Sequence, residues 1–228
     1  MSIDLARVKG LCFDVDGTLS DTDDVWEARL MKICAHVPYL FRGKNPQPFA
    51  RWLVMATESP MNQIYHMLDR LSLDDNFARL YNRVSQSRKR TAPPFKIMKG
   101  ARELLDLVRE RYPLTVVSAR DEISTRRFLK QFDLGPYFGE VVTSQTCEFT
   151  KPFPHPVTHA ASAMGLQAPQ CVMIGDTTVD ILAGKAAGAQ TVDLLCGFGT
   201  EKELYKAGAD LVLRDLTELR EVFLTTPG

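Results

Sequence analysis

The chain has 228 residues, enough for one sizeable core with an insertion or for two small domains. Its 28 Lys and Arg residues balance 28 Asp and Glu residues, so no overall basic field attracts nucleic acid or an anionic membrane surface. The five cysteines show no C-x-x-C spacing, so we expect reduced cysteines and a cytoplasmic protein. Charges interrupt the first residues and no apolar stretch reaches about 18 residues, so we expect no secretory signal and no membrane span.

The first predicted element is a buried strand at 10–14, which runs into a glycine-containing turn with the sequence Asp14-Val15-Asp16-Gly17-Thr18. Carboxylates two positions apart at the end of a strand can lean into one site. This arrangement suits phosphoryl transfer, in which Asp14 attacks phosphorus and Asp16 donates a proton to the departing alkoxide. Because a carboxylate and a phosphate dianion repel each other, the site also needs a divalent cation and fixed hydrogen-bond donors.

The stretch at 21–91 interrupts the strand and helix alternation of the rest of the chain. It contains few convincing strands, and its helical patterns lie at 25–35, 49–57, 62–71 and 75–87. We expect an inserted α-helical cap with hinges at 19–22 and 91–94, whose closure would exclude water from the site.

After this insertion, short apolar runs alternate again with helical patterns. The predicted strands lie at 114–118, 141–144, 171–175 and 190–195, and the predicted helices at 101–110, 123–132, 156–164 and 179–187. The pattern indicates the α/β class: a doubly wound parallel sheet, or Rossmann-like core, formed by residues 1–20 and 92–228. In such sheets the ligand site lies beyond the carboxyl ends of the strands.

Two further candidates for phosphate binding follow the second strand. Ser118 and Ala119 stand between that strand and a helix start, where a hydroxyl and backbone amides can hold phosphate oxygens, although a turn or capping role is the simpler reading of a lone serine. Lys151 begins the segment 151–156, in which alternate prolines keep the backbone extended and fix the base of the lysine. A single Lys-Pro pair is also common in surface loops.

Two more acids follow the strand at 171–175. Asp176 and Asp180 are spaced so that both can reach a site at the end of the strand. The structural alternative is that Asp176 or Thr177 caps the following helix while Asp180 lies in solvent in its first turn.

The order and spacing of these residues resemble the haloacid dehalogenase superfamily. Its members carry D-x-D at the first strand, Ser or Thr at the second, Lys in a proline-rich stretch and G-D-x-x-x-D at the fourth, and the resemblance covers about residues 8–20 and 96–196. It implies a magnesium-dependent phosphomonoester hydrolase that works through an aspartyl-phosphate. The implied roles are Asp14 as nucleophile, Asp16 as general acid and base, Ser118, Ala119 and Lys151 as phosphate-binding residues, and Asp14, Asp16 through its carbonyl, Asp176 and Asp180 as residues at Mg²⁺.

The second acid of the D-x-D motif and features outside the core motifs indicate the branch. Asp16 favours an alcohol leaving group, because dehalogenases and phosphonatases of the superfamily lack this second acid. The helical insertion resembles the cap of the phosphoglycolate phosphatase-like branch, and a covered pocket suits a small phosphorylated metabolite. This branch often places a specificity loop where Arg42 and Lys44 lie, so either residue is a candidate partner for a carboxylate or second phosphate, with a charged surface loop as the simpler reading.

Two other functions remain open. A sugar phosphomutase of the beta-phosphoglucomutase type shares all of these core motifs, whereas a non-catalytic binding module of the same fold should have lost at least one of them. The chain also departs from the family at Arg120, which stands near the phosphate loop where many members have Asn or a small residue. The sequence makes no prediction of oligomeric state.

Overall fold

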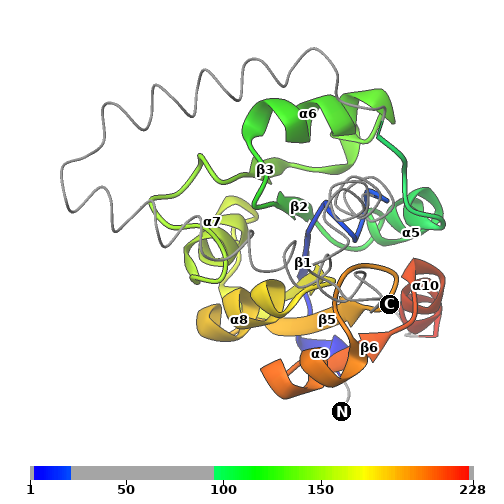
Figure 1. The fold of residues 1–228 in the computed structure, drawn as a ribbon, viewed down its shortest axis with the longest axis vertical. Coiled ribbons are helices and arrows are strands. Elements are labelled where there is room, and N and C mark those ends of the chain that lie inside the picture. The colour runs from blue at the N-terminus through cyan, green and yellow to red at the C-terminus, as the bar shows by residue number, and fades with distance from the viewer. Residues whose placement is uncertain (1–2, 22–94, 226–228) are drawn as a thin grey trace, which may run out of the picture. The chain divides into compact units, whose positions relative to one another are not determined.

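Six parallel strands form the centre of the part of the chain described here, residues 3–21 and 95–225 of a computed structural model (Figure 1). The strands are β1 (Gly10–Phe13), β2 (Leu114–Val117), β3 (Glu140–Val142), β4 (Cys171–Gly175), β5 (Gln190–Leu194) and β6 (Leu211–Leu213). Their order in the sheet is β3-β2-β1-β4-β5-β6, and every neighbouring pair is parallel. This confirms the predicted α/β, doubly wound sheet, whose order reverses between β1 and β4.

Helices cover both faces of the sheet. They are α5 (Ala101–Val108), α6 (Glu122–Gln131), α7 (His155–Ala163), α8 (Thr178–Ala187), α9 (Glu201–Ala207) and α10 (Leu216–Leu224), with short 3₁₀ turns at Leu5–Arg7, Gly135–Tyr137 and Ala168–Gln170. Because side chains alternate along β1, Leu11 and Phe13 enter the core that α5, α6 and α10 cover, whereas Cys12 enters the core under α7 and α8. Figure 1 shows α5 and α10 on one side of the sheet and α7 and α8 on the other.

Local chemistry explains where several helices begin and end. The Asp121 side chain accepts a hydrogen bond from the backbone N–H of Ser124 at the start of α6, and Asp215 caps α10 in the same way. Gly188 ends α8 in the left-handed conformation, with φ of 82°, which glycine adopts without steric cost. Each predicted strand and helix of the core is present within two residues of its expected bounds, but β6, α9 and α10 were not predicted.

The predicted cap lies outside the described residues, apart from Asp21. Arg42 and Lys44 therefore also lie outside them, and the division into a core and a cap stays a prediction. No helix among residues 3–21 and 95–225 is both long enough and apolar enough to cross a membrane.

One buried acid stands apart from the predicted site. Gly184 of α8 packs closely against Thr191 of β5, so Thr191 faces α8. Asp193 lies two positions later on the same strand and therefore faces α8 as well. Its side chain is 1% exposed, and neither of its carboxylate oxygens has a hydrogen-bond partner in the described part of the chain. Burial raises the pKa of Asp193 well above its ordinary value, and the nearby carboxylate of Asp180 adds to the effect.

We expect Asp193→Asn to stabilise the metal-free protein at about pH 8 and to give a smaller gain at about pH 5. The folded state holds the Asp193 proton to a higher pH than the unfolded chain does. The wild type therefore loses stability as the pH rises through the raised pKa, whereas the amide has no charge to bury. Urea unfolding of both proteins in EDTA at the two pH values measures the difference. Glu110→Gln, at an exposed ion pair, is the control, and an Asp193→Asn effect that does not change with pH would contradict the prediction.

Candidate active site

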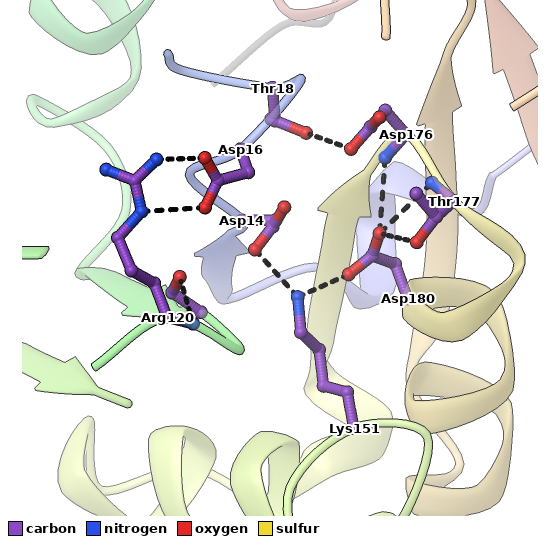
Figure 2. A network of polar contacts seen from close by, with 9 residues as sticks. Asp14, Asp16, Thr18, Arg120, Lys151, Asp176, Thr177 and Asp180 are labelled. Atoms are coloured by element: carbon purple, nitrogen blue, oxygen red, sulfur yellow. Dashed lines mark hydrogen bonds and ion pairs between the residues drawn. The ribbon is translucent and has the colours of Figure 1, made fainter. Parts of the chain in front are cut away.

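The loops that follow β1, β2 and β4 meet at the carboxyl edge of the sheet, where the strand order reverses. The first loop carries Asp14 and Asp16, the second Ser118, and the third Asp176 and Asp180. Figure 2 shows Asp14 and Asp180 converging on Lys151, which comes from the loop before α7. The predicted core residues thus lie in one place, although their catalytic roles stay predictions.

Lys151 is the buried cation of this cluster. Its Nζ donates hydrogen bonds to Asp14 Oδ1 at 2.7 Å and to Asp180 Oδ1 at 2.5 Å, and its side chain is only 3% exposed. Burial lowers the pKa of Lys151, but the two adjacent carboxylates outweigh that effect and raise it above its ordinary value. The ammonium group therefore stays charged and fixes the positions of both acids.

Asp14 is buried at the end of β1, and its backbone N–H donates to the Ile174 carbonyl of β4. Burial raises the pKa of the Asp14 carboxyl, while the Lys151 ammonium opposes this shift and Asp180 adds to it. A carboxylate with so little water around it is a better nucleophile than a solvated one, provided that nearby cations keep it ionised.

The start of α8 holds the other two acids. Thr177 is the N-cap, and Asp180 completes a capping box by accepting hydrogen bonds from the Thr177 N–H at 3.1 Å and from the Thr177 hydroxyl at 2.7 Å. The capping alternative is therefore right for Thr177, but wrong for Asp180 as a solvated residue, because Asp180 is 1% exposed and also pairs with Lys151. One carboxylate thus joins a helix cap to Lys151, the candidate phosphate-binding lysine.

Asp176 is enclosed by backbone from two other loops. Its carboxylate accepts hydrogen bonds from the Thr18 hydroxyl at 3.3 Å and from the backbone N–H of Phe198 at 2.8 Å. A Cβ atom at Gly17 would lie 2.2 Å from Asp176 Oδ2, and one at Gly197 would lie 2.1 Å from it. Only glycine permits this approach, and Gly17 also has φ of 75°. No role was predicted for Thr18, Gly197 or Phe198, and no spacing of the acidic motifs points to the 197–198 loop.

Three acids of the cluster have the chemistry of a cation site. Oxygen atoms of Asp14, Asp176 and Asp180 lie within 4.8 Å of one another, and all three residues are buried. An all-oxygen donor set of this charge fits a hard divalent cation such as Mg²⁺. This group does not include the Asp16 side chain, and a metal-binding role for the Asp16 backbone carbonyl stays a prediction.

The loop after β2 contains the predicted phosphate-binding hydroxyl. Ser118 is 3% exposed, and its Oγ accepts a hydrogen bond from the backbone N–H of Arg120 at 3.1 Å. Its own N–H donates to the Val142 carbonyl of β3. The Ser118 hydroxyl therefore stabilises the turn, which is the structural alternative for this serine. Ala119 lies between Ser118 and Arg120, which this hydrogen bond joins.

Arg120 contacts the other acid of the D-x-D motif. Its Nε donates to Asp16 Oδ2 at 2.9 Å and its Nη2 donates to Asp16 Oδ1, so the guanidinium grips both carboxylate oxygens. Figure 2 shows Asp16 turned toward Arg120 and away from Lys151. The sequence marked Arg120 only as a departure from the family and predicted no contact with Asp16.

The family model described as haloacid dehalogenase-like hydrolase matches residues 11–194. The phosphoglycolate phosphatase of Neisseria meningitidis is 35% identical over 112 residues, which cover 48% of this chain and about half (48%) of that relative. The pyrophosphatase PpaX of Halalkalibacterium halodurans is 24% identical over 218 residues, which cover 95% of this chain and 97% of the relative.

Solved structures agree on the fold. A haloacid dehalogenase family hydrolase from Deinococcus radiodurans, solved with bound phosphate and sodium, superposes with a TM-score of 0.70 at 24% identity and covers 98% of this chain and 100% of its own. A hydrolase of the same superfamily from Ehrlichia chaffeensis gives a TM-score of 0.60 at 19% identity, covering 98% of both chains.

The family match spans β1 to β5 and therefore every core residue of the candidate site. The predicted resemblance to the haloacid dehalogenase superfamily, and with it the prediction of a hydrolytic enzyme, is confirmed. The chain belongs to the haloacid dehalogenase-like hydrolase family.

Proposed function

We propose that this chain is a magnesium-dependent phosphatase that cleaves a small phosphorylated metabolite through an aspartyl-phosphate on Asp14. The observation that carries the proposal is the buried Lys151 ammonium, which joins Asp14 to Asp180 beside Asp176. This geometry supplies a fixed carboxylate nucleophile, a buried cation next to it and oxygen ligands for a divalent metal. The phosphatase and the pyrophosphatase among the similar proteins support the same reaction class.

In the first half of the proposed reaction, an Asp14 oxygen attacks phosphorus, a new O–P bond forms, and the bond from phosphorus to the leaving oxygen breaks. Asp16 gives its proton to that oxygen, so an alcohol departs, or a second phosphate when pyrophosphate is the substrate. In the second half, Asp16 takes a proton from water, the water oxygen attacks phosphorus, and the Asp14–phosphorus bond breaks to release inorganic phosphate. Lys151 and the Ser118 loop hold the phosphoryl oxygens throughout.

The metal site would be made by Asp14, Asp176 and Asp180 with the Asp16 carbonyl. A bound divalent cation supplies positive charge that offsets the repulsion between the nucleophile and the phosphate. The chain's own contribution is to hold the ligands in place: Thr18 and the Phe198 N–H orient Asp176, and Lys151 with Thr177 orients Asp180.

The substrate class follows from the relatives and from the predicted cap. Phosphoglycolate and pyrophosphate are the first candidates, because they are the substrates in the names of the similar enzymes. Arg42 and Lys44 of the predicted cap are the proposed partners of a carboxylate or second phosphate on the substrate.

Asp14→Asn should lower phosphate release by more than about 1,000-fold, because an amide cannot form the aspartyl-phosphate. The assay measures inorganic phosphate from phosphoglycolate, pyrophosphate and hexose phosphates, with and without magnesium. Asp106→Asn, an exposed acid that accepts a hydrogen bond from Tyr137, is the matched control and should retain activity.

Other outcomes of this assay separate the alternatives. Isomerised hexose phosphate without phosphate release would identify a phosphomutase. A folded protein that is inactive in both readouts would favour a binding module. Phosphate release that survives in Asp14→Asn would contradict the assigned nucleophile.

Mg²⁺ should raise the unfolding temperature of the metal-stripped wild type by several degrees, because a ligand at about 100 times its Kd stabilises the folded state by roughly 2.7 kcal/mol. Asp176→Asn should lose most of this shift, since the amide removes one charged ligand of the cluster. Asp121→Asn, at the N-cap of α6, is the control and should keep the full shift. An equal shift in Asp176→Asn would place the bound metal elsewhere. Differential scanning calorimetry measures all three proteins.

A further inference from the structure

Arg120 connects two loops of the site. Its backbone N–H donates to Ser118 Oγ in the loop after β2, and its side chain donates twice to Asp16 in the loop after β1. Its carbonyl accepts hydrogen bonds from the N–H and the hydroxyl of Ser144, which follows β3. One residue therefore ties together the ends of three neighbouring strands.

The guanidinium is held from a second direction by an aromatic ring. Its Cζ atom lies 4.8 Å from the ring centre of Phe95, and the Phe95 ring in turn packs edge-on against Phe128 in the core, with 5.8 Å between the ring centres. The Arg120 side chain is 13% exposed and that of Asp16 is 21% exposed. A planar cation fixed by a ring face and by two carboxylate oxygens has little rotational freedom left, so its partner carboxylate is also fixed.

We propose that Arg120 is a positioning residue for the general acid and base Asp16, an inference that rests on the proposed phosphatase function. Within the described part of the chain, the Lys151 ammonium donates hydrogen bonds to Asp14 and Asp180 but not to Asp16, so another group must orient this second acid of the D-x-D motif. The Arg120 fork supplies that orientation and neutralises charge in a site rich in carboxylates.

The competing role for an arginine in this place is direct recognition of the substrate. Nη1 of Arg120 is buried and has no hydrogen-bond partner in the described part of the chain, so it is the donor that an anionic substrate group would use. The other two donor nitrogens, however, are both taken by Asp16. Because Nε and Nη2 already donate to Asp16, the geometry favours positioning of Asp16 over recognition of the substrate. The two roles can be separated, since they affect different substrates.

A residue that acts through the general acid matters most when the leaving group needs a proton. Ethoxide departs from ethyl phosphate only with protonation, whereas nitrophenolate departs from p-nitrophenyl phosphate without it. Displacing the acid from its productive position costs on the order of 100-fold when the proton transfer is needed. Loss of Arg120 should therefore reduce ethyl phosphate hydrolysis much more than p-nitrophenyl phosphate hydrolysis.

The experiment compares kcat/KM for these two substrates in the wild type, Arg120→Met and Arg120→Lys. In Arg120→Met, we expect kcat/KM for ethyl phosphate to fall by about 30-fold or more. The fold-loss for p-nitrophenyl phosphate should be smaller by a factor of at least about ten. Arg120→Lys keeps the charge but loses the fork, so it should show the same selective loss to a smaller extent. It also keeps the test valid if the Met variant unfolds, which thermal unfolding will show.

Two controls make the result specific. Arg127→Met removes an exposed cation whose Cζ lies 5.7 Å from the centre of the same Phe95 ring, and it should leave the ratio between the two substrates unchanged. In the Asp16→Asn background, Arg120→Met should cause no further selective loss, because the residue through which it acts is already gone. The wild type with p-nitrophenyl phosphate, against Asp14→Asn, tests the phosphatase function separately.

Three outcomes would overturn the proposal. Equal loss with both substrates would mean that Arg120 supports only the fold of the site. A selective loss that persists unchanged in the Asp16→Asn background would mean that it does not act through Asp16. With phosphoglycolate as a third substrate in the same variants, a loss confined to phosphoglycolate, with ethyl phosphate unaffected, would mean that the guanidinium binds the carboxylate of the substrate.

Discussion

The site depends on one buried ammonium group between two buried carboxylates. Lys151 has almost no access to water, so removing this lysine would leave two buried carboxylates without their compensating cation, which is far more costly than losing a surface ion pair. The contact also joins distant parts of the sequence, because Lys151 lies 137 residues after Asp14 and 29 before Asp180. With Asp176 included, the cluster has three acids for one lysine, and this surplus of negative charge is what makes a divalent cation a suitable ligand.

The sheet brings these groups together. Its order reverses between β1 and β4, so the loops that leave these neighbouring strands diverge toward opposite faces, which is where sheets of this kind bind ligands. Backbone chemistry then sets the fine spacing. Gly17 and Gly197 let two loops approach the Asp176 carboxylate more closely than any side chain would allow, and the capping box of α8 fixes Asp180. The rigid elements thus orient the acids before any substrate arrives.

Periodicity predicted most of this core. The runs of β1, β2 and β4 are buried along their whole length, which makes them easy to recognise, and the polar residues directly after these three strands marked the edge that carries the site. Strand β6 has only three residues and α9 buries only Leu204, so neither produces a pattern that stands out from a loop. The contact between Arg120 and Asp16 joins side chains 104 residues apart in the sequence. The lack of a hydrogen-bond partner for the Asp193 carboxylate in the described residues depends on how β5 and α8 pack. The spacing of residues along the chain encodes neither feature.

The most direct test of the account is the chemical identity of the intermediate. Single-turnover reactions with the favoured substrate would be quenched in acid, reduced with borohydride and digested, and the peptide containing residues 10–20 would be analysed by mass spectrometry. An aspartyl-phosphate on Asp14 is reduced to homoserine, so the account predicts homoserine at position 14 alone, dependent on magnesium and transient in time. Phosphate release with an unmodified Asp14 at every time point, or homoserine at Asp16, would contradict it.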